Sequence, residues 1–480
     1  MSEKELPAGW IWARLSDVLS EPLINGRSVR TLDGGFPVLR LTSIKDGSID
    51  LSQSKEGAWD EEDARPFLVA QGDYLLSRGN GSRNLVGRGG LVGEIPDPVA
   101  FPDTMVRVRV DPKIMAPKYL RHLWDSPAIR RQIEFMARTT AGIYKVNQKM
   151  LETISFFLPP RAEQDRIVEA LEGHLSRLGA AAATARNCRK RLANLSKSIL
   201  LTMVPEEVPD RWIAATVEQA GTVELGRARH PDWHHGPEMR PYLRVANVFE
   251  DRIDASDVME MDFSGIFEKY RLHPGDVLLN EGQSPHLVGR PALYRGTPPN
   301  VAFTNSLLRF KANPNVMPEW ALMVFRRHLH ARRFMKEVRI TTNIAHLSSK
   351  RLKVVEFPIP PMGVQKELVL RCDELLSGVD AMDREAVRTL KRADNLRRAI
   401  LNRAFTGNLV PQDPTDEPAS ALLAGVQAER AAQPRAKRTR SASTTPRKAK
   451  KSPAAAPTES APAPSPTAAP AHAVQQEFDL

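Results

Sequence analysis

The sequence predicts an α/β protein made of two copies of one domain, two long coiled-coil helices and a disordered C-terminal tail. Three observations predict this fold class. Similar segments recur about 200 residues apart, two Pro-free segments carry a heptad pattern, and the composition changes near residue 412. A period this long fits a duplicated domain pair, because solenoid repeats span only roughly 20 to 50 residues.

The internal repeat rests on five matches that occur in the same order in both halves. They pair 6–10 with 208–212, 37–41 with 241–245, 72–76 with 275–279, 86–88 with 288–290, and 158–160 with 359–361. The offsets are 202, 204, 203, 202 and 201 residues. Five ordered matches with so little drift indicate a duplication, with domains over 1–158 and 206–358.

Each copy mixes short apolar segments, bounded by Gly and Pro, with one helical segment, which is typical of a compact α/β domain. The strands expected in the first copy are 38–44, 74–77 and 105–110, followed by a helix over 117–138. Those expected in the second copy are 242–248, 277–279 and 307–310, followed by a helix over 318–336.

Each domain is followed by a segment, 159–205 or 359–411, with apolar residues seven positions apart. These residues are Leu171, Leu178, Ala185, Leu192 and Ile199 in the first segment and Cys372, Val379, Ala386, Ala393 and Ile400 in the second. A seven-residue apolar stripe predicts a coiled-coil seam. About forty residues make a helix roughly 60 Å long. We expect the two helices to pack on each other as a spacer.

Residues 412–480 are rich in Ala, Pro, Ser and Thr, which predicts a disordered tail. A basic cluster between Arg435 and Lys451 contains no acidic residue. It suits a solvated tail, or alternatively a non-specific tether for phosphates. The final residues, 475–480, weakly resemble a sliding-clamp-binding peptide.

Charge and cysteine content restrict the class of protein. The chain has 68 Lys and Arg against 57 Asp and Glu, a net charge of +11 that suits a polyanionic partner. Cys188 and Cys372 are too few for a disulfide framework or a zinc site. With no signal core and no long apolar run, we expect a cytoplasmic protein without a membrane partner.

The sequence lacks the usual catalytic constellations. It contains no Gly-x-x-x-x-Gly-Lys-Ser/Thr loop for ATP and no Asp/Asn-Pro-Pro-aromatic methyltransferase tetrad. Asp103, Asp111 and Lys113 have the spacing of a nuclease core, but Pro112 interrupts the required strand and the second copy has no equivalent. His230, His234 and His235 lack a fourth metal ligand nearby and are expected to be loop residues.

The remaining chemistry is that of DNA reading. In both copies, a polar segment follows a strand and ends in Val-Gly-Arg, and a second polar segment follows the helix. Arg can bind guanine or phosphate, and Asn and Gln can bind adenine edges. The candidate DNA-binding residues are Arg78, Asn80, Arg83, Asn84, Arg88, Thr140, Tyr144 and Lys145 in the first copy and Asn280, Gln283, Ser284, Arg290, Thr341, Thr342 and Asn343 in the second.

These motifs together resemble type I restriction-modification specificity subunits. The resemblance rests on the doubled Gly-Asp-hydrophobic-Leu-Leu, Val-Gly-Arg and Thr-Thr motifs and on Pro-Pro-x-x-x-Gln at the start of each long helix. The segments 404–413 and 417–420, which close the second helix, belong to it as well. The resemblance covers about residues 1–425.

The resemblance implies two target-recognition domains held apart by two antiparallel spacer helices. Each domain would read half of a bipartite sequence in double-stranded DNA. Two methyltransferase subunits would carry S-adenosylmethionine for adenine-N6 methylation, and two motor-nuclease subunits would use ATP and Mg²⁺ for cleavage. This chain would bind none of these cofactors and would not be an enzyme. The alternatives are a stand-alone DNA-binding or architectural protein and, less favoured, an intrinsic enzyme.

Overall fold

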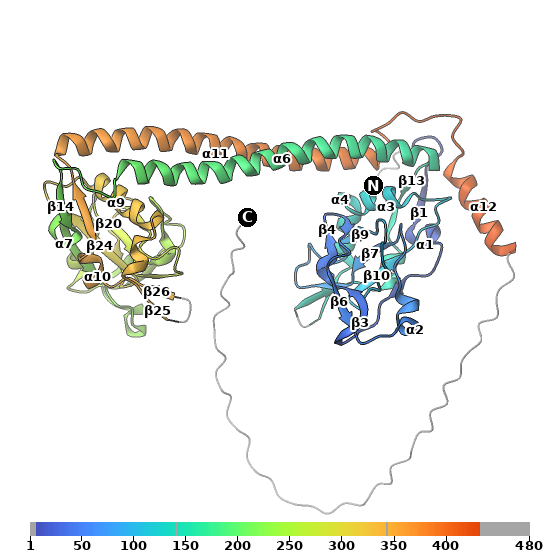
Figure 1. Cartoon of the computed structure of the whole chain (residues 1–480), viewed down its shortest axis with the longest axis horizontal. Helices are drawn as coiled ribbons and strands as arrows, with labels where there is room; N and C mark the ends of the chain where they lie inside the picture. Colours follow the sequence, from blue (N-terminus) through green and yellow to red (C-terminus); the bar gives the residue numbers. More distant parts are fainter. Residues whose placement is uncertain (1–5, 141, 342–343, 433–480) are drawn as a thin grey trace, which may run out of the picture. The chain divides into compact units, whose positions relative to one another are not determined.

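The computed structural model describes residues 6–140, 142–341 and 344–432. Residues up to Gln427 form one compact unit, in which two α/β lobes pack on a pair of long helices (Figure 1). None of the helices in the described part of the chain is long and apolar enough to cross a membrane.

The first lobe begins and ends in the same two-stranded sheet. β1 (Ile11–Arg14) pairs antiparallel with β13 (Ser155–Leu158), which leads directly into the first long helix. The other strands are β2 (Ile24–Asn25), β3 (Thr31–Leu39), β4 (Ile44–Lys45), β5 (Ser48–Ile49), β6 (Ser54–Gly57), β7 (Tyr74–Ser77), β8 (Gly79–Asn80), β9 (Gly89–Leu91), β10 (Met105–Val108), β11 (Arg138–Thr140) and β12 (Ile143–Lys145). The helices are α1 (Leu15–Val18), α2 (Glu61–Ala64), α3 (Pro117–Trp124), α4 (Pro127–Met136) and α5 (Gln148–Glu152).

The second lobe has the same plan. β14 (Ile213–Thr216) pairs antiparallel with β27 (Glu356–Ile359), which again leads into a long helix. Between them lie the strands β15 (Gly221–Leu225), β16 (Met239–Leu243), β17 (Val248–Phe249), β18 (Arg252–Ile253), β19 (Met259–Asp262), β20 (Val277–Asn280), β21 (Gly282–Gln283), β22 (Pro291–Leu293), β23 (Ala302–Phe303), β24 (Leu307–Ala312), β25 (Arg339–Thr341) and β26 (Ile344–His346). The helices are α7 (Val217–Ala220), α8 (Phe267–Tyr270), α9 (Pro318–His330) and α10 (Ser349–Lys353).

The central sheet of each lobe separates two hydrophobic cores. The first sheet has the order β2-β10-β7-β9-β5-β4 and the second β15-β24-β20-β22. Side chains of a strand alternate between faces. Tyr74 and Leu76 therefore enter the core that includes α3, while Leu75 enters the core on the other face. In the second lobe, Val277 and Leu279 likewise enter one core, while Leu278 enters the core on the other face of the sheet.

Both predicted lobe helices end earlier than expected. The helix predicted over 117–138 is two helices, because Ser126 caps the start of α4 and Pro127 cannot donate a hydrogen bond to the preceding turn. The helix predicted over 318–336 ends at His330. Arg332 then takes a left-handed conformation (φ 54°) before a 3-10 turn over Arg333–Lys336.

Several strand limits also differ from the prediction. In the segments predicted as strands over 38–44 and 242–248, the strand ends early, at Leu39 and at Leu243. A 3-10 turn follows in each segment. β10 stops at Val108 rather than residue 110, and β24 extends to Ala312. The strand predicted over 74–77 is found with the same limits.

The two long helices, α6 (Arg161–Met203) and α11 (Met362–Ala404), lie side by side (Figure 1). Leu171 near the start of α6 shares a core with Leu401 near the end of α11, so the helices run antiparallel. The predicted seam is confirmed by burial. The buried members are Leu171, Ala185, Leu192, Ile199, Cys372, Val379 and Ala386, and Leu178, Ala393 and Ile400 are half-buried.

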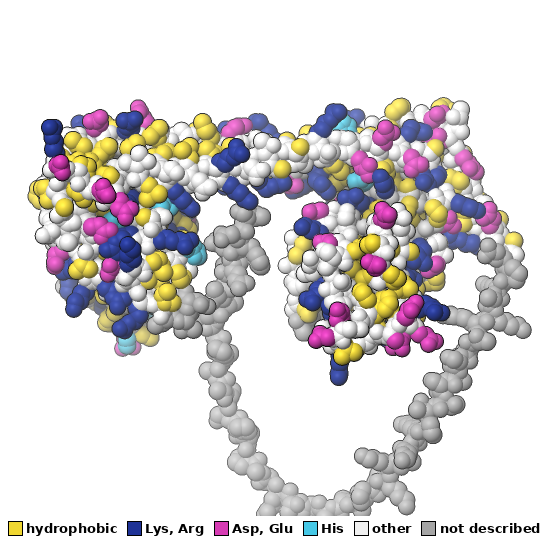
Figure 2. Space-filling view, viewed as in Figure 1, with side chains coloured by type: hydrophobic (Ala, Val, Ile, Leu, Met, Phe, Trp, Pro, Cys, Tyr) yellow, Lys and Arg dark blue, Asp and Glu magenta, His cyan; other side chains and the backbone are white. Residues whose placement is uncertain are grey.

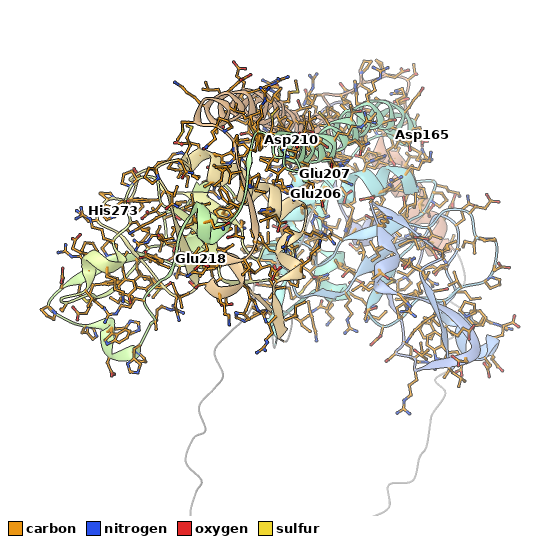
Figure 3. The ribbon with its side chains drawn as sticks, turned by 60° about the vertical axis from the view of Figure 1, so that its left-hand side comes forward. Asp165, Glu206, Glu207, Asp210, Glu218 and His273 are labelled. Atoms are coloured by element: carbon orange, nitrogen blue, oxygen red, sulfur yellow. The ribbon has the colours of Figure 1, made fainter. Side chains whose placement is uncertain are left out.

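Each lobe shares its core with one end of this helical pair. Ile167 and Ala404 belong to the core of the first lobe, and Ile199 and Val369 belong to that of the second. The connection from α6 to the second lobe contains three acidic residues, Glu206, Glu207 and Asp210 (Figure 3). Glu206 forms an ion pair with Arg327 of α9 at 3.4 Å. The lobes are therefore fixed to the helices by apolar packing as well as by the chain.

The prediction that residues 412–480 lack structure is wrong for residues 419–432, which form α12 (Ala419–Ala432). Its residues Ala419, Leu423 and Val426 are buried in the first lobe's core. Asp416, just before α12, pairs with Arg166 of α6 at 2.5 Å. The basic cluster between residues 435 and 451 and the segment 475–480 lie outside the described residues.

Candidate nucleic-acid interface

The two polar segments predicted to read DNA in the first half meet in one three-stranded sheet. β8 pairs with β12, placing Asn80 opposite Tyr144 and Gly79 opposite Lys145, and β12 pairs with β11. We call this sheet, made of β8, β11 and β12, the first projection. It brings together residues that are more than sixty positions apart in the sequence.

The second half builds the same arrangement, here called the second projection, from β21, β25 and β26. β21 pairs with β26, placing Gly282 opposite His346 and Gln283 opposite Ala345 (β25 and β26 in Figure 1). Lys145 and His346 thus hold the same place in the two projections, opposite Gly79 and Gly282.

The Val-Gly-Arg motif ends each polar segment, and its glycine is hydrogen-bonded to the end of the strand from which the segment starts. Gly87 has φ +65°, and a Cβ added there would lie 2.7 Å from Cγ2 of Ile133, so only glycine fits without rearrangement. Its backbone N–H donates to Ser77 O at 2.9 Å. Gly289 repeats both features, with φ +74° and a hydrogen bond to Asn280 O at 2.9 Å. The motif therefore keeps the loop frame the same while the loop residues differ.

The predicted residues of the first half lie around this frame. Arg83 and Asn84 are exposed, and Arg83 Nε donates to Glu134 O at 2.8 Å, which holds the loop against α4. Arg88 is exposed and its Nε donates to Asn84 O at 3.1 Å. Lys145 is exposed, while Arg78, Asn80 and Tyr144 are half-buried. The Asn80 side-chain oxygen accepts a hydrogen bond from Ser82 N at 3.0 Å.

In the second half, one predicted contact is wrong. The Asn280 side chain is fully buried in β20, in the position that Ser77 occupies in the first half, so it cannot meet a ligand. Gln283 and Ser284 are half-buried, and the Gln283 side-chain oxygen accepts from Ser284 N at 3.1 Å. Arg290 is half-buried, with its guanidinium 4.7 Å from the ring centroid of Phe249.

For four of the predicted residues, the side chain is not described. Thr342 and Asn343 lie outside the described residues, as do the side chains of Thr140 and Thr341.

The structure adds residues that the sequence reasoning missed. Arg138 and Arg339 are exposed at matching places in β11 and β25, opposite Lys145 and His346. Ile143, Ile340 and Ile344 are exposed apolar residues of the projections. The sequence did contain a signal for these two residues, since Arg138 and Arg339 are 201 positions apart, which is an offset of the internal repeat.

The described side chains of both projections offer hydrogen-bonding groups, positive charge and exposed apolar surface. Basic side chains are scattered over both lobes and along the helices (Figure 2). In the described part of the chain, no three His, Cys, Asp or Glu side chains gather as a metal site would require.

Comparison with known proteins identifies relatives along nearly the whole chain, although no family model matches. The chain is 24% identical to the type I restriction enzyme EcoKI specificity subunit of Escherichia coli K12, over 92% of this chain and 100% of that protein. It is 23% identical to the StySPI specificity subunit of Salmonella potsdam, over 90% and 97% of the two chains.

Among solved structures, one chain from a study of type I restriction-modification complex assembly shares the fold. It has a TM-score of 0.65 and 20% identity, and the match covers 84% of this chain and all of the other. This match shows that the fold is shared, and the relatives above show that the chain is similar over nearly its whole length to type I restriction enzyme specificity subunits.

Proposed function

We propose that this chain reads a bipartite sequence in double-stranded DNA and directs adenine-N6 methylation, or ATP-dependent cleavage, by partner subunits. The observation that carries the proposal is the repetition of one projection with different side chains. Lys145 and His346 hold the same place in the two projections but differ in chemistry. The loop of the first half exposes Arg83 and Asn84, whereas the corresponding loop of the second half contains Ser284 followed by Pro and His.

Different side chains on one frame suit two different half-sites. Arg and Lys bind guanine O6 and N7, Asn and Gln bind adenine N6 and N7, and apolar side chains contact the thymine methyl group. The major groove of DNA admits a two-stranded β-ribbon, and each projection contains one, the antiparallel pair β11 and β12 or the pair β25 and β26. The antiparallel helices carry one lobe at each end, so the two lobes are related by an approximate two-fold axis. The two strands of a DNA duplex are related by the same kind of axis.

The partners follow from the family and from the catalytic groups that the sequence lacks. Two methyltransferase subunits would bind S-adenosylmethionine, and two motor-nuclease subunits would bind ATP and Mg²⁺. The chain itself would bind no cofactor, and the assembly would act in the cytoplasm, where the DNA is.

The test is to map N6-methyladenine in host DNA by long-read sequencing, with the gene present and deleted. We expect a split motif, methylated on both strands, that disappears on deletion. An unchanged map would contradict the proposal and favour a stand-alone DNA-binding protein. Strong Mg²⁺-dependent cutting by the purified chain alone would instead favour an intrinsic nuclease.

A further inference from the structure

A basic cleft separates the first projection from the helical pair. It has a volume of about 1030 Å³ and is lined by the base of the recognition segment, by α4, by the turn after β4, and by α6 and α11. Its basic side chains outnumber its acidic ones two to one. The six basic residues are Lys45, Arg88, Arg130, Arg186, Arg397 and Arg398, against Asp46, Asp125 and Asp394.

Internal ion pairs neutralise only part of this charge. Arg398 pairs with Asp394, and Arg397 Nη2 lies 3.6 Å from Asp125 Oδ2. Arg186 is exposed and has no ion-pair partner among the described residues. Arg130 Nη2 lies 3.9 Å from Glu134 Oε1 and donates to Val86 O at 2.8 Å, while its Nη1 is buried without a hydrogen bond to the described residues. A cleft lined mainly by one sign of charge attracts ions of the opposite sign, here anions.

A smaller cleft, of about 240 Å³, occupies the related place in the second lobe. Arg290 and Arg332 line it from the lobe and Lys197 lines it from α6, together with one acidic residue, Glu250. Arg290 is the counterpart of Arg88, and Lys197, 201 positions before Arg398, is the counterpart of that residue. In each cleft the arginine of Val-Gly-Arg therefore lies near a cation from the helix that closes the other half's domain.

We propose that the two basic clefts bind the phosphate backbone of the unread spacer DNA between the half-sites. This inference rests on the proposed function. Ser77, Asn80 and Arg88 line the first cleft and belong to the segment whose loop would read bases, so the cleft adjoins the surface that would hold the duplex. Spacer DNA is not read, so contacts to it need charge rather than base-specific hydrogen bonds. The first cleft, being larger and more basic, contributes more.

The test measures the DNA affinity of the complete methyltransferase complex against salt concentration, for a target duplex and for one without the motif. Each phosphate contact adds about 0.9 to the slope of log affinity against log salt. We expect Arg186→Gln to lower the slope by about 1 and R397Q/R398Q by about 1 to 2. Both variants lose affinity equally for the two duplexes and keep the methylated motif. Lys197→Gln gives a smaller change of the same kind.

The matched control is R388Q/R392Q. It removes two charges from α11, but both residues are exposed, pair with Glu385 and lie outside the cleft. We expect the control to leave the slope unchanged. Arg186→Gln breaks no ion pair with the described residues, so it tests the cleft even if R397Q/R398Q impairs folding by leaving Asp125 unpaired.

A second measurement identifies the source of the phosphate. Neutral methylphosphonates in the spacer beside the first half-site should weaken binding of the wild-type complex and not weaken R397Q/R398Q further. An unchanged salt slope in Arg186→Gln and R397Q/R398Q, with the motif intact, would overturn the cleft assignment alone. Weakened assembly with the methyltransferase subunits at an unchanged slope would show a protein contact instead and also overturn it. A wild-type complex that reads no split motif would overturn the proposed function itself.

Discussion

Gln164 and Gln365, 201 positions apart, make the same three hydrogen bonds at the starts of the two long helices. Gln164 accepts from Ala116 N at 2.9 Å and donates to Ile114 O at 2.8 Å and Pro159 O at 3.1 Å. Gln365 repeats the set with Met317 N, Asn315 O and Pro360 O, each at 2.8 Å. Both side chains are fully buried. Each one therefore ties a lobe helix to the long helix that follows that lobe.

Replacing Gln164 by Met should loosen the first junction only. The substitution keeps the volume but leaves the buried Ala116 N–H and two carbonyl groups without their partner, which costs about 1 to 3 kcal/mol for each unsatisfied group. We expect faster hydrogen exchange at the Ala116 amide and unchanged exchange at Met317. Gln365→Met is the matched variant and should give the reverse pattern. Loss of protection at both amides in either variant would show that the junctions are not independent.

The stability lost on truncating a leucine of the long helices should depend on how deeply that leucine is buried. Leu192 is 6% exposed in the core of the second lobe and the seam, whereas Leu195 on the same helix is 48% exposed. We expect Leu192→Ala to lower the free energy of unfolding by about 2 kcal/mol or more. Leu195→Ala should change it by less than about 0.5 kcal/mol. Thermal melting of the two variants measures the difference, and equal effects would mean that the seam is misassigned.

Periodic features of the fold could be predicted from the sequence, and features made by distant contacts could not. The heptads around Ala185 and Ala386 repeat a local spacing, which is sufficient to predict both long helices. Asn80 and Tyr144 are far apart in the sequence and pair only through tertiary contacts. The sequence therefore predicted two separate loops, which the structure joins in one projection. α12 was missed because its Ala-rich composition resembles the tail, although Leu423 and Val426 carry an apolar face.

The candidate site was predictable only in outline, for a similar reason. The Val-Gly-Arg motif marked both candidate recognition segments, since Gly87 and Gly289 both adopt positive φ where the loop closes. Asn280 looked like a reader because it follows a strand, but it is the last residue of β20 and faces the core. The first cleft brings together Arg88 and Arg398, which are 310 positions apart, a relationship that no local pattern contains.

Acid should destabilise the first lobe through His122. Burial, followed by the charge of Arg121, lowers the pKa of His122 from 6.5 to about 4. The unfolded chain gains a proton as the pH falls through 6.5, and the folded protein does not until about pH 4. Stability is therefore lost between pH 6.5 and 4, by about 3 kcal/mol in all.

The variant His122→Gln isolates this effect, because glutamine does not titrate. We expect its melting temperature to fall less than that of the wild type between pH 7 and pH 4. His174→Gln removes an exposed histidine of α6 and serves as the control, with the wild-type pH dependence. If His122→Gln and His174→Gln give the same pH profile, the buried histidine does not limit acid stability.

Lys145 and His346 offer a direct test of modular reading, because they occupy the same place in the two projections with different chemistry. Lys145 is exposed, and His346 is half-buried with Nδ1 3.3 Å from Glu281 Oε2. If each contacts a base, its loss should cost about 1 to 3 kcal/mol of discrimination at one position. We expect Lys145→Ala to relax the methylated motif in one half-site and His346→Ala to relax it in the other. Methylation mapping of each variant reads both half-sites at once. Relaxation of both halves by one substitution would mean that the projections do not read independently, because a local contact cannot alter a half-site held by the other lobe.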